Sequence, residues 1–67
     1  MRKELYEKML DFLEYEESYA KKKGIPLKKE DLFQNWWKEN KVYCEKEKIN
    51  FINAREIWKS VWEVLFP

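Results

Sequence analysis

Histidine is absent from this 67-residue chain, which also has only one cysteine, one glycine and two prolines. Without histidine, the serine–histidine and cysteine–histidine pairs that activate nucleophiles cannot form, and histidine metal sites are excluded. A single glycine likewise excludes a glycine-rich loop that would hold phosphate groups. From these absences we expect no catalytic residues, no metal ligands, no cofactor and no small-molecule substrate.

The one cysteine, Cys44, cannot form a disulfide bond within the chain, which favours a reducing compartment and leaves open only a bond between two copies. Because Cys44 follows Trp37 at a helical spacing, we expect it to be a small buried apolar residue. No N-terminal segment has the pattern of a signal peptide, and no apolar run approaches the roughly 20 residues that span a bilayer. We therefore expect a cytoplasmic protein without a membrane partner.

The charges are nearly balanced, with 14 basic and 13 acidic residues and a formal net charge of +1. Such a chain has no net field that would attract a polyanion from a distance. Glu7, Asp11 and Glu14 fall on one side of the first expected helix, but acid–base catalysis also needs a dry pocket that shifts a pKa. Because a chain of this size has little room for one, we interpret these carboxylates as a solvated face and expect no enzyme activity.

Aromatic residues are abundant, with four each of tryptophan, tyrosine and phenylalanine. A chain this short buries only about 60% of the surface that its unfolded form exposes, so its core is small. Each buried tryptophan removes roughly 150–250 Å² from water, and large rings can therefore compensate for a short chain. We expect one helical domain over residues 1–67.

The first expected helix covers residues 2–23. Its apolar residues repeat at intervals of three and four, as one buried face requires: Leu5, Tyr6, Met9, Leu10, Phe12 and Leu13. Gly24 can take the left-handed position after the last turn, and Pro26 prevents continuation of the helix. Glu16 falls in the middle of the apolar face. Either the last two turns project beyond the core, which we favour, or Glu16 is buried against a lysine or arginine.

The second expected helix begins after Leu27. Trp36 lies within its apolar arc and Trp37 at the edge, which predicts a core position for the first ring and a half-exposed position for the second. The same rhythm resumes beyond Asn40, and we favour one continuous or kinked helix that reaches about residue 48. The alternative is a break at Asn40, a residue that can terminate a helix in the left-handed conformation, followed by a short helix over residues 41–48.

The last expected helix starts at Asn53, whose side chain can cap the first amides while Glu56 reaches back to close a capping box. Ile52 and Ile57 fit the hydrophobic contact that accompanies this motif. The apolar rhythm then continues to Leu65, where we expect the helix to end.

These segments predict an all-α fold. The short joints around residues 24–27 and 49–52 place neighbouring helices antiparallel. We expect a small three-helix bundle, or four helices if the second one breaks near Asn40. A β-hairpin that pairs residues 42–44 with residues 50–52 is the weaker alternative.

Two groups of side chains are candidates for contact with another molecule. Tyr15, Tyr19 and Trp37 are large rings with a polar atom at the edges of the expected apolar faces, which is typical of protein contact sites. A purely internal role for these rings is the alternative. The second group joins basic side chains to one ring and could bind nucleic acid: Lys21, Lys22, Lys23, Lys28, Lys29, Arg55, Lys59 and Trp62. Its alternative is a solvated basic loop and a last helix whose long stems cover the core edge.

We hypothesise a non-catalytic helical interaction module that uses its edge aromatics, such as an adaptor, an inhibitor, a regulatory subunit or a bundle that associates with itself. The supporting pattern is an abundance of rings without catalytic groups. The alternative is a small nucleic-acid-binding regulator that uses Arg55, Lys59 and the basic loop of Lys21–Lys29. We favour another protein or a second copy as the partner over nucleic acid.

Overall fold

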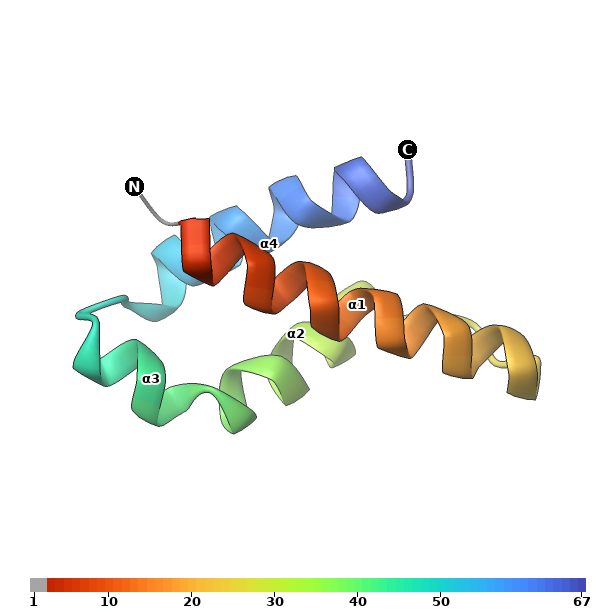
Figure 1. Ribbon diagram of the computed structural model, residues 1–67, viewed down its shortest axis with the longest axis horizontal. Coiled ribbons are helices and arrows are strands. Elements are labelled where there is room, and N and C mark those ends of the chain that lie inside the picture. Colours follow the sequence, from red (N-terminus) through yellow and green to blue (C-terminus); the bar gives the residue numbers. More distant parts are fainter. Residues whose placement is uncertain (1–2) are drawn as a thin grey trace.

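The computed structural model describes residues 3–67 as four helices (Figure 1): α1 (Lys3–Lys23), α2 (Lys29–Glu39), α3 (Lys41–Lys46) and α4 (Phe51–Leu65). The expected start of the first helix at Arg2 lies outside the described residues. Within them there is no strand, so the all-α prediction is confirmed and the hairpin alternative is wrong. In Figure 1, α2 runs against the direction of α1 and α4, which gives the expected antiparallel succession.

One apolar core lies between α1, α2 and α4, and no polar or charged residue is buried among residues 3–67. Three large rings meet at its centre: the ring centroid of Trp58 lies 5.5 Å from that of Phe33 and 6.3 Å from that of Trp36. Trp36 is therefore a core residue as predicted, with 1% of its surface exposed, and Cys44 is buried as predicted. Trp36 Nε1 is buried without a hydrogen-bond partner in the described part of the chain.

The end of α1 follows the sequence prediction. Gly24 has a φ of +68°, and the Ile25 amide donates to the Ala20 carbonyl oxygen at 2.9 Å, which closes the last turn. Beyond Leu13, Ala20 is the only buried residue of α1, and Glu16 stays partly exposed. Figure 1 shows these C-terminal turns extending past the ends of α2 and α4. The prediction that the last turns of α1 project beyond the core is confirmed. The alternative, in which Glu16 is buried against a basic residue, is wrong.

The favoured continuous second helix is wrong, because the chain breaks at Asn40 into α2 and α3. The Asn40 amide and its side-chain Nδ2 both donate to the Trp36 carbonyl oxygen, at 3.0 and 2.9 Å. The backbone of Asn40 has a φ of −111°, so the break does not use the left-handed conformation that we expected. The side chain instead shares the Trp36 carbonyl with its own amide at the end of α2.

The end of α3 does use the left-handed conformation, at Lys48 rather than at an asparagine or a glycine. Lys48 has a φ of +58°, and the Ile49 amide donates to the Cys44 carbonyl oxygen at 2.8 Å. This pattern repeats the one at the end of α1, with a lysine in place of Gly24. The short helix therefore ends at Lys46, two residues before the expected boundary.

The start of α4 lies earlier than predicted. Asn50 is the N-cap, and its side-chain oxygen accepts a hydrogen bond from the Asn53 amide at 2.8 Å. The capping box between Asn53 and Glu56 is therefore wrong, because Asn53 already lies in the first turn. The contact of Ile52 with Ile57 is also wrong, since 69% of the surface of Ile52 is exposed. Ile49, one residue before the cap, is the buried residue instead.

Candidate functional site

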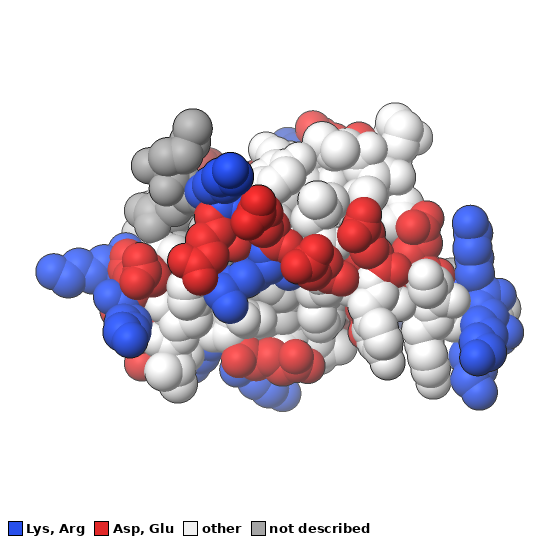
Figure 2. Space-filling view, in the orientation of Figure 1, with Lys and Arg blue, Asp and Glu red and all other residues white. Residues whose placement is uncertain are grey.

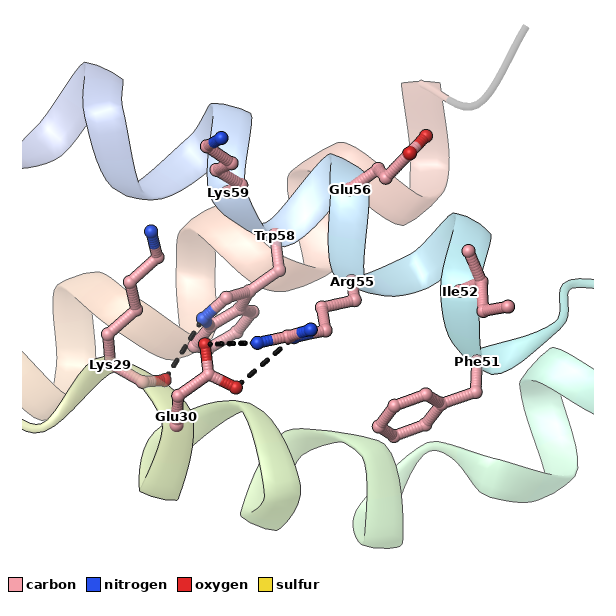
Figure 3. A pocket seen from close by; sticks show the side chains of 8 residues that line it. All are labelled: Lys29, Glu30, Phe51, Ile52, Arg55, Glu56, Trp58 and Lys59. Carbon is pink, nitrogen blue, oxygen red and sulfur yellow. Dashed lines mark hydrogen bonds and ion pairs between the residues drawn. The ribbon is translucent and has the colours of Figure 1, made fainter.

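A groove lies between the first turn of α2 and residues 51–59 of α4, and we call it the α2–α4 groove. Its volume is about 410 Å³. The residues that line it are Lys29, Glu30, Phe51, Ile52, Arg55, Glu56, Trp58 and Lys59 (Figure 3). Because residues of two helices line the groove, its shape depends on the angle at which α2 and α4 cross.

The wall of the groove is fixed by two interactions between residues far apart in the sequence. Trp58 Nε1 donates to the Lys29 carbonyl oxygen at 3.2 Å, and this ties the buried ring of α4 to the first turn of α2. Arg55 forms a forked contact with Glu30: Nε donates to Oε1 at 3.2 Å, and an Nη nitrogen lies 3.0 Å from Oε2. These contacts hold the start of α2 against α4.

The Arg55–Glu30 pair changes the interpretation of Arg55. The sequence analysis made this guanidinium a candidate for contact with nucleic acid. In the structure it already pairs with the carboxylate of Glu30. Both side chains are about half exposed, so the pair contributes little to stability, although it fixes geometry. It is the one ion pair within residues 3–67.

The two lysines and the exposed apolar residues that line the groove lie at opposite ends of it, while the carboxylate of Glu56 points away from the Arg55–Glu30 pair. Figure 3 shows the ammonium groups of Lys29 and Lys59 on one side of the Arg55–Glu30 pair, with Phe51 and Ile52 on the other. Neither lysine has an ion-pair partner among the described residues. The groove therefore offers positive charge at one end and exposed apolar surface at the other.

An aromatic edge continues from the apolar end of the groove. Phe51 packs edge-on against Trp37, with ring centroids 5.3 Å apart, and also against Phe33 at 5.2 Å. Trp37 is partly buried, as its position at the edge of the apolar arc predicted. The structure thus joins Trp37 to α4.

Tyr15 and Tyr19, which the sequence analysis grouped with Trp37, make no ring contact with it in the described part of the chain. Trp37 makes its ring contacts with Phe33 and Phe51. The Tyr19 ring instead faces the ammonium of Lys23, which lies 6.0 Å from the centroid of the Tyr19 ring. Tyr15 and Tyr19 are both exposed, on the projecting part of α1. No ring contact within residues 3–67 joins either tyrosine to Trp37.

The basic loop predicted from the sequence forms one end of the molecule. Lys21, Lys22 and Lys23 are exposed in the last turn of α1, and Lys28 is exposed just before α2. Figure 2 shows basic side chains gathered at the end of the molecule where α1 ends in Figure 1. Lys29 and Lys59 belong to the α2–α4 groove instead.

Trp62, the ring assigned to base stacking, lies in α4 away from the groove lining. It is partly buried and packs on Phe66 with ring centroids 4.5 Å apart. Phe66 is partly buried too, so the pair covers the edge of the core. Trp62 therefore already makes a tilted contact with a neighbouring ring.

Tyr43 is a titratable group whose pKa is shifted by its surroundings in the fold. Partial burial raises the pKa of the Tyr43 phenol, and the nearby carboxylates of Glu4 and Glu47 raise it further because they disfavour a second negative charge. The ammonium of Lys8 lies 4.7 Å from the centroid of the Tyr43 ring. Tyr43 thus links the start of α1 to α3.

Comparisons with protein-family models, with curated proteins and with solved structures found no match to this chain. Within residues 3–67 there is no group of three or more acidic, histidine or cysteine side chains arranged to hold a metal ion. None of the helices described there has both the length and the apolar character of a membrane span.

Sequence reasoning missed Phe51, Ile52 and Glu30 as members of a site. The signal was present in the segment from Ile49 to Asn53, where two asparagines three residues apart compete to cap the helix. Taking Asn50 as the cap places Ile52, Arg55 and Lys59 on one face of α4 at helical spacing. The contribution of Glu30 depends on the crossing of two helices.

Proposed function

We propose that this protein is a non-catalytic helical interaction module that binds a partner through the α2–α4 groove and the aromatic edge beside it. The observation that carries the proposal is Ile52, whose side chain is 69% exposed at the mouth of a groove with a fixed wall. Phe51 and Trp37 extend the same surface. Large rings at the edge of a hollow are the residues that most often dominate binding energy at protein interfaces.

A partner gains from this surface because its wall is already ordered. The hydrogen bond from Trp58 and the Arg55–Glu30 pair hold the lining residues in place before binding. Binding to an ordered surface loses less conformational entropy than binding to a mobile one. Each apolar side chain that is covered contributes roughly 25 cal/mol per Å² removed from water.

Ile52→Asp tests the proposal. We expect this variant to fold, because Ile52 is exposed. Its affinity for the specific partner should fall at least about tenfold, since a charge would be desolvated at the contact. The measurement compares the proteins that co-purify with tagged wild-type and variant chains from the cells of origin. Each recovered partner is then titrated as a purified protein by calorimetry.

Val42→Asp is the matched control, because Val42 is an aliphatic residue of α3 that is at least as exposed as Ile52 (77% against 69%) and lies outside the groove. We expect this variant to keep the same partner with unchanged affinity. If both variants bind like the wild type, the groove is not the contact surface.

Nucleic-acid binding is a second candidate, supported by the gathering of Lys21, Lys22 and Lys23 beside the exposed ring of Tyr19. Exposed cations with an adjacent ring suit the backbone and bases of a single strand. Fluorescence anisotropy of labelled single-stranded DNA tests it. Binding at low salt that weakens steeply as salt rises would support this function, and no anisotropy change at low salt would remove it.

A further inference from the structure

The exposed side of α1 carries an acidic face that no contact within the protein uses. Asp11 and Glu14 point away from the core, because the buried Leu5, Met9 and Leu13 define the opposite side of the helix. Figure 2 shows acidic side chains in a row along α1 that ends near the lysine cluster. These carboxylates have no ion-pair partner among residues 3–67.

Exposed tyrosine rings flank this acidic face on the projecting turns. Tyr15 is 67% exposed and follows Glu14 directly, and Tyr19 lies one turn later. We call Asp11, Glu14, Tyr15 and Tyr19 together the α1 acidic–tyrosine face. Because these turns extend past α2 and α4 in Figure 1, another molecule can reach them without displacing either helix.

The α1 acidic–tyrosine face and the α2–α4 groove are complementary. The face offers carboxylates beside rings. The groove, which is also lined by Glu56, offers the ammonium groups of Lys29 and Lys59 at one end and the apolar surface of Phe51 and Ile52 at the other. Opposite charges would meet at one end of the contact and apolar groups at the other. The chain therefore carries both halves of one interface.

We propose that the α2–α4 groove binds the α1 acidic–tyrosine face of a second copy of this chain. The inference rests on the proposed function, in which the groove is a contact surface, and it names the occupant. Figure 3 shows α1 behind α2 and α4 when the groove faces the viewer, so the groove and the acidic face lie on different sides of the molecule. A bound copy then leaves its own groove open, and association continues head to tail.

The association is weak. A stable interface covers about 800 Å² and about 20–30 residues on each partner, roughly a sixth of this molecule's 5107 Å² surface, whereas eight residues line the groove. We expect the weight-average mass to rise steadily from the monomer's 8.5 kDa as the concentration increases from about 10 µM to about 1 mM. At about 0.5 M salt, where exposed charges act over only a few ångströms, we expect the rise to shrink at least threefold.

Charge reversal in two separate variants tests the pairing by sedimentation equilibrium. One variant is Lys29→Glu with Lys59→Glu, and the other is Asp11→Lys with Glu14→Lys. Alone, each variant has two surfaces of like charge, so we expect it to remain monomeric. Mixed in equal amounts, each variant's α1 matches the other's groove, and we expect the mass increase of the wild type to return. Circular dichroism verifies that each variant keeps its helical content.

The matched control is Lys41→Glu with Lys46→Glu, which changes the net charge by the same amount on exposed residues of α3. We expect this variant to associate like the wild type. A wild-type mass that stays at the monomer value, a mixture that stays monomeric, or a mass increase that nuclease abolishes would overturn the second-copy inference. None of these results bears on the Ile52→Asp comparison with other partners, so the two proposals can fail separately.

Discussion

Trp36 and Trp58 occupy the same core, and at the residue scale they differ in one hydrogen bond. Both rings are almost completely buried, but Trp58 Nε1 donates to the Lys29 carbonyl oxygen while Trp36 Nε1 has no partner in the described residues. A buried polar group without a partner costs about 1–3 kcal/mol of folded-state stability. The two tryptophans therefore contribute unequally although they bury similar apolar surface.

The first prediction compares phenylalanine at these two positions. Trp36→Phe and Trp58→Phe both remove core volume, but only Trp58→Phe removes a hydrogen bond. We expect Trp58→Phe to lower the free energy of unfolding by about 1 kcal/mol more than Trp36→Phe does. Urea unfolding followed by circular dichroism measures the difference. Equal losses, or a larger loss at Trp36, would contradict the hydrogen-bond assignment.

The second prediction concerns Tyr43 at alkaline pH. The folded state raises the pKa of this phenol above its usual 10.0, so it keeps the phenol neutral more strongly than the unfolded chain does. The resulting stability is complete below about pH 10 and is lost as the pH rises through the raised folded pKa, because the unfolded phenol ionises first.

Tyr43→Phe isolates this effect. Between about pH 9 and pH 11, we expect the wild type to lose more unfolding free energy than Tyr43→Phe, since lysine titration is common to both proteins. Urea midpoints measured across this range provide the comparison. Parallel losses would show that Tyr43 has an ordinary pKa in the folded protein.

At the element scale, α1 and α3 end with the same hydrogen-bond pattern on different residues. Gly24 takes a positive φ without strain, whereas Lys48 takes it with a side chain that crowds its own backbone. No atom lies within 4 Å of a Cβ placed on Gly24, so the cost of adding one there is purely conformational.

The third prediction exchanges the residue types at these two ends. Gly24→Ala should lower the unfolding free energy by about 1 kcal/mol, and Lys48→Gly should raise it by roughly 0.5–1 kcal/mol. For a domain of this size, 1 kcal/mol shifts the melting temperature by about 4–8 °C. Thermal unfolding of both variants checks the pair, and a lower melting temperature for Lys48→Gly would refute the strain at that position.

Element ends also show how far the sequence could predict the fold. The end of α1 was predictable because Gly24 and Pro26 act locally. Asn40 and Asn50 were harder, since an asparagine side chain can cap, break or terminate a helix with similar energies. At Asn50 the choice is accompanied by burial of Ile49, and sequence spacing does not reveal that burial.

The candidate site was less predictable than the helices for a reason of geometry. The contacts that form the groove join Arg55 to Glu30 and Trp58 to Lys29, residues 25 and 29 positions apart. Helical periodicity assigned Trp36 and Cys44 to the core because it depends only on spacing within one element. The angle at which α2 crosses α4 is set by side-chain packing, and the groove depends on that angle.

At the scale of the whole molecule, charge is abundant but is hardly used internally. The chain has 27 charged residues that ionise at neutral pH, yet one ion pair forms within residues 3–67. The fold is therefore held by its rings and aliphatic residues, and the charged surface stays available for other molecules. Exposed pairs contribute little in any case, so their scarcity costs the fold little stability.

The projecting end of α1 divides the helix into a clamped half and a loose half. Backbone amides before Leu13 are held by the core, whereas those after it are held mainly by the helix itself and by Ala20. Amide hydrogens in the second half should exchange with deuterium through local fraying, long before global unfolding releases the first half. One continuous helix thus combines a rigid N-terminal segment with a C-terminal segment that opens locally.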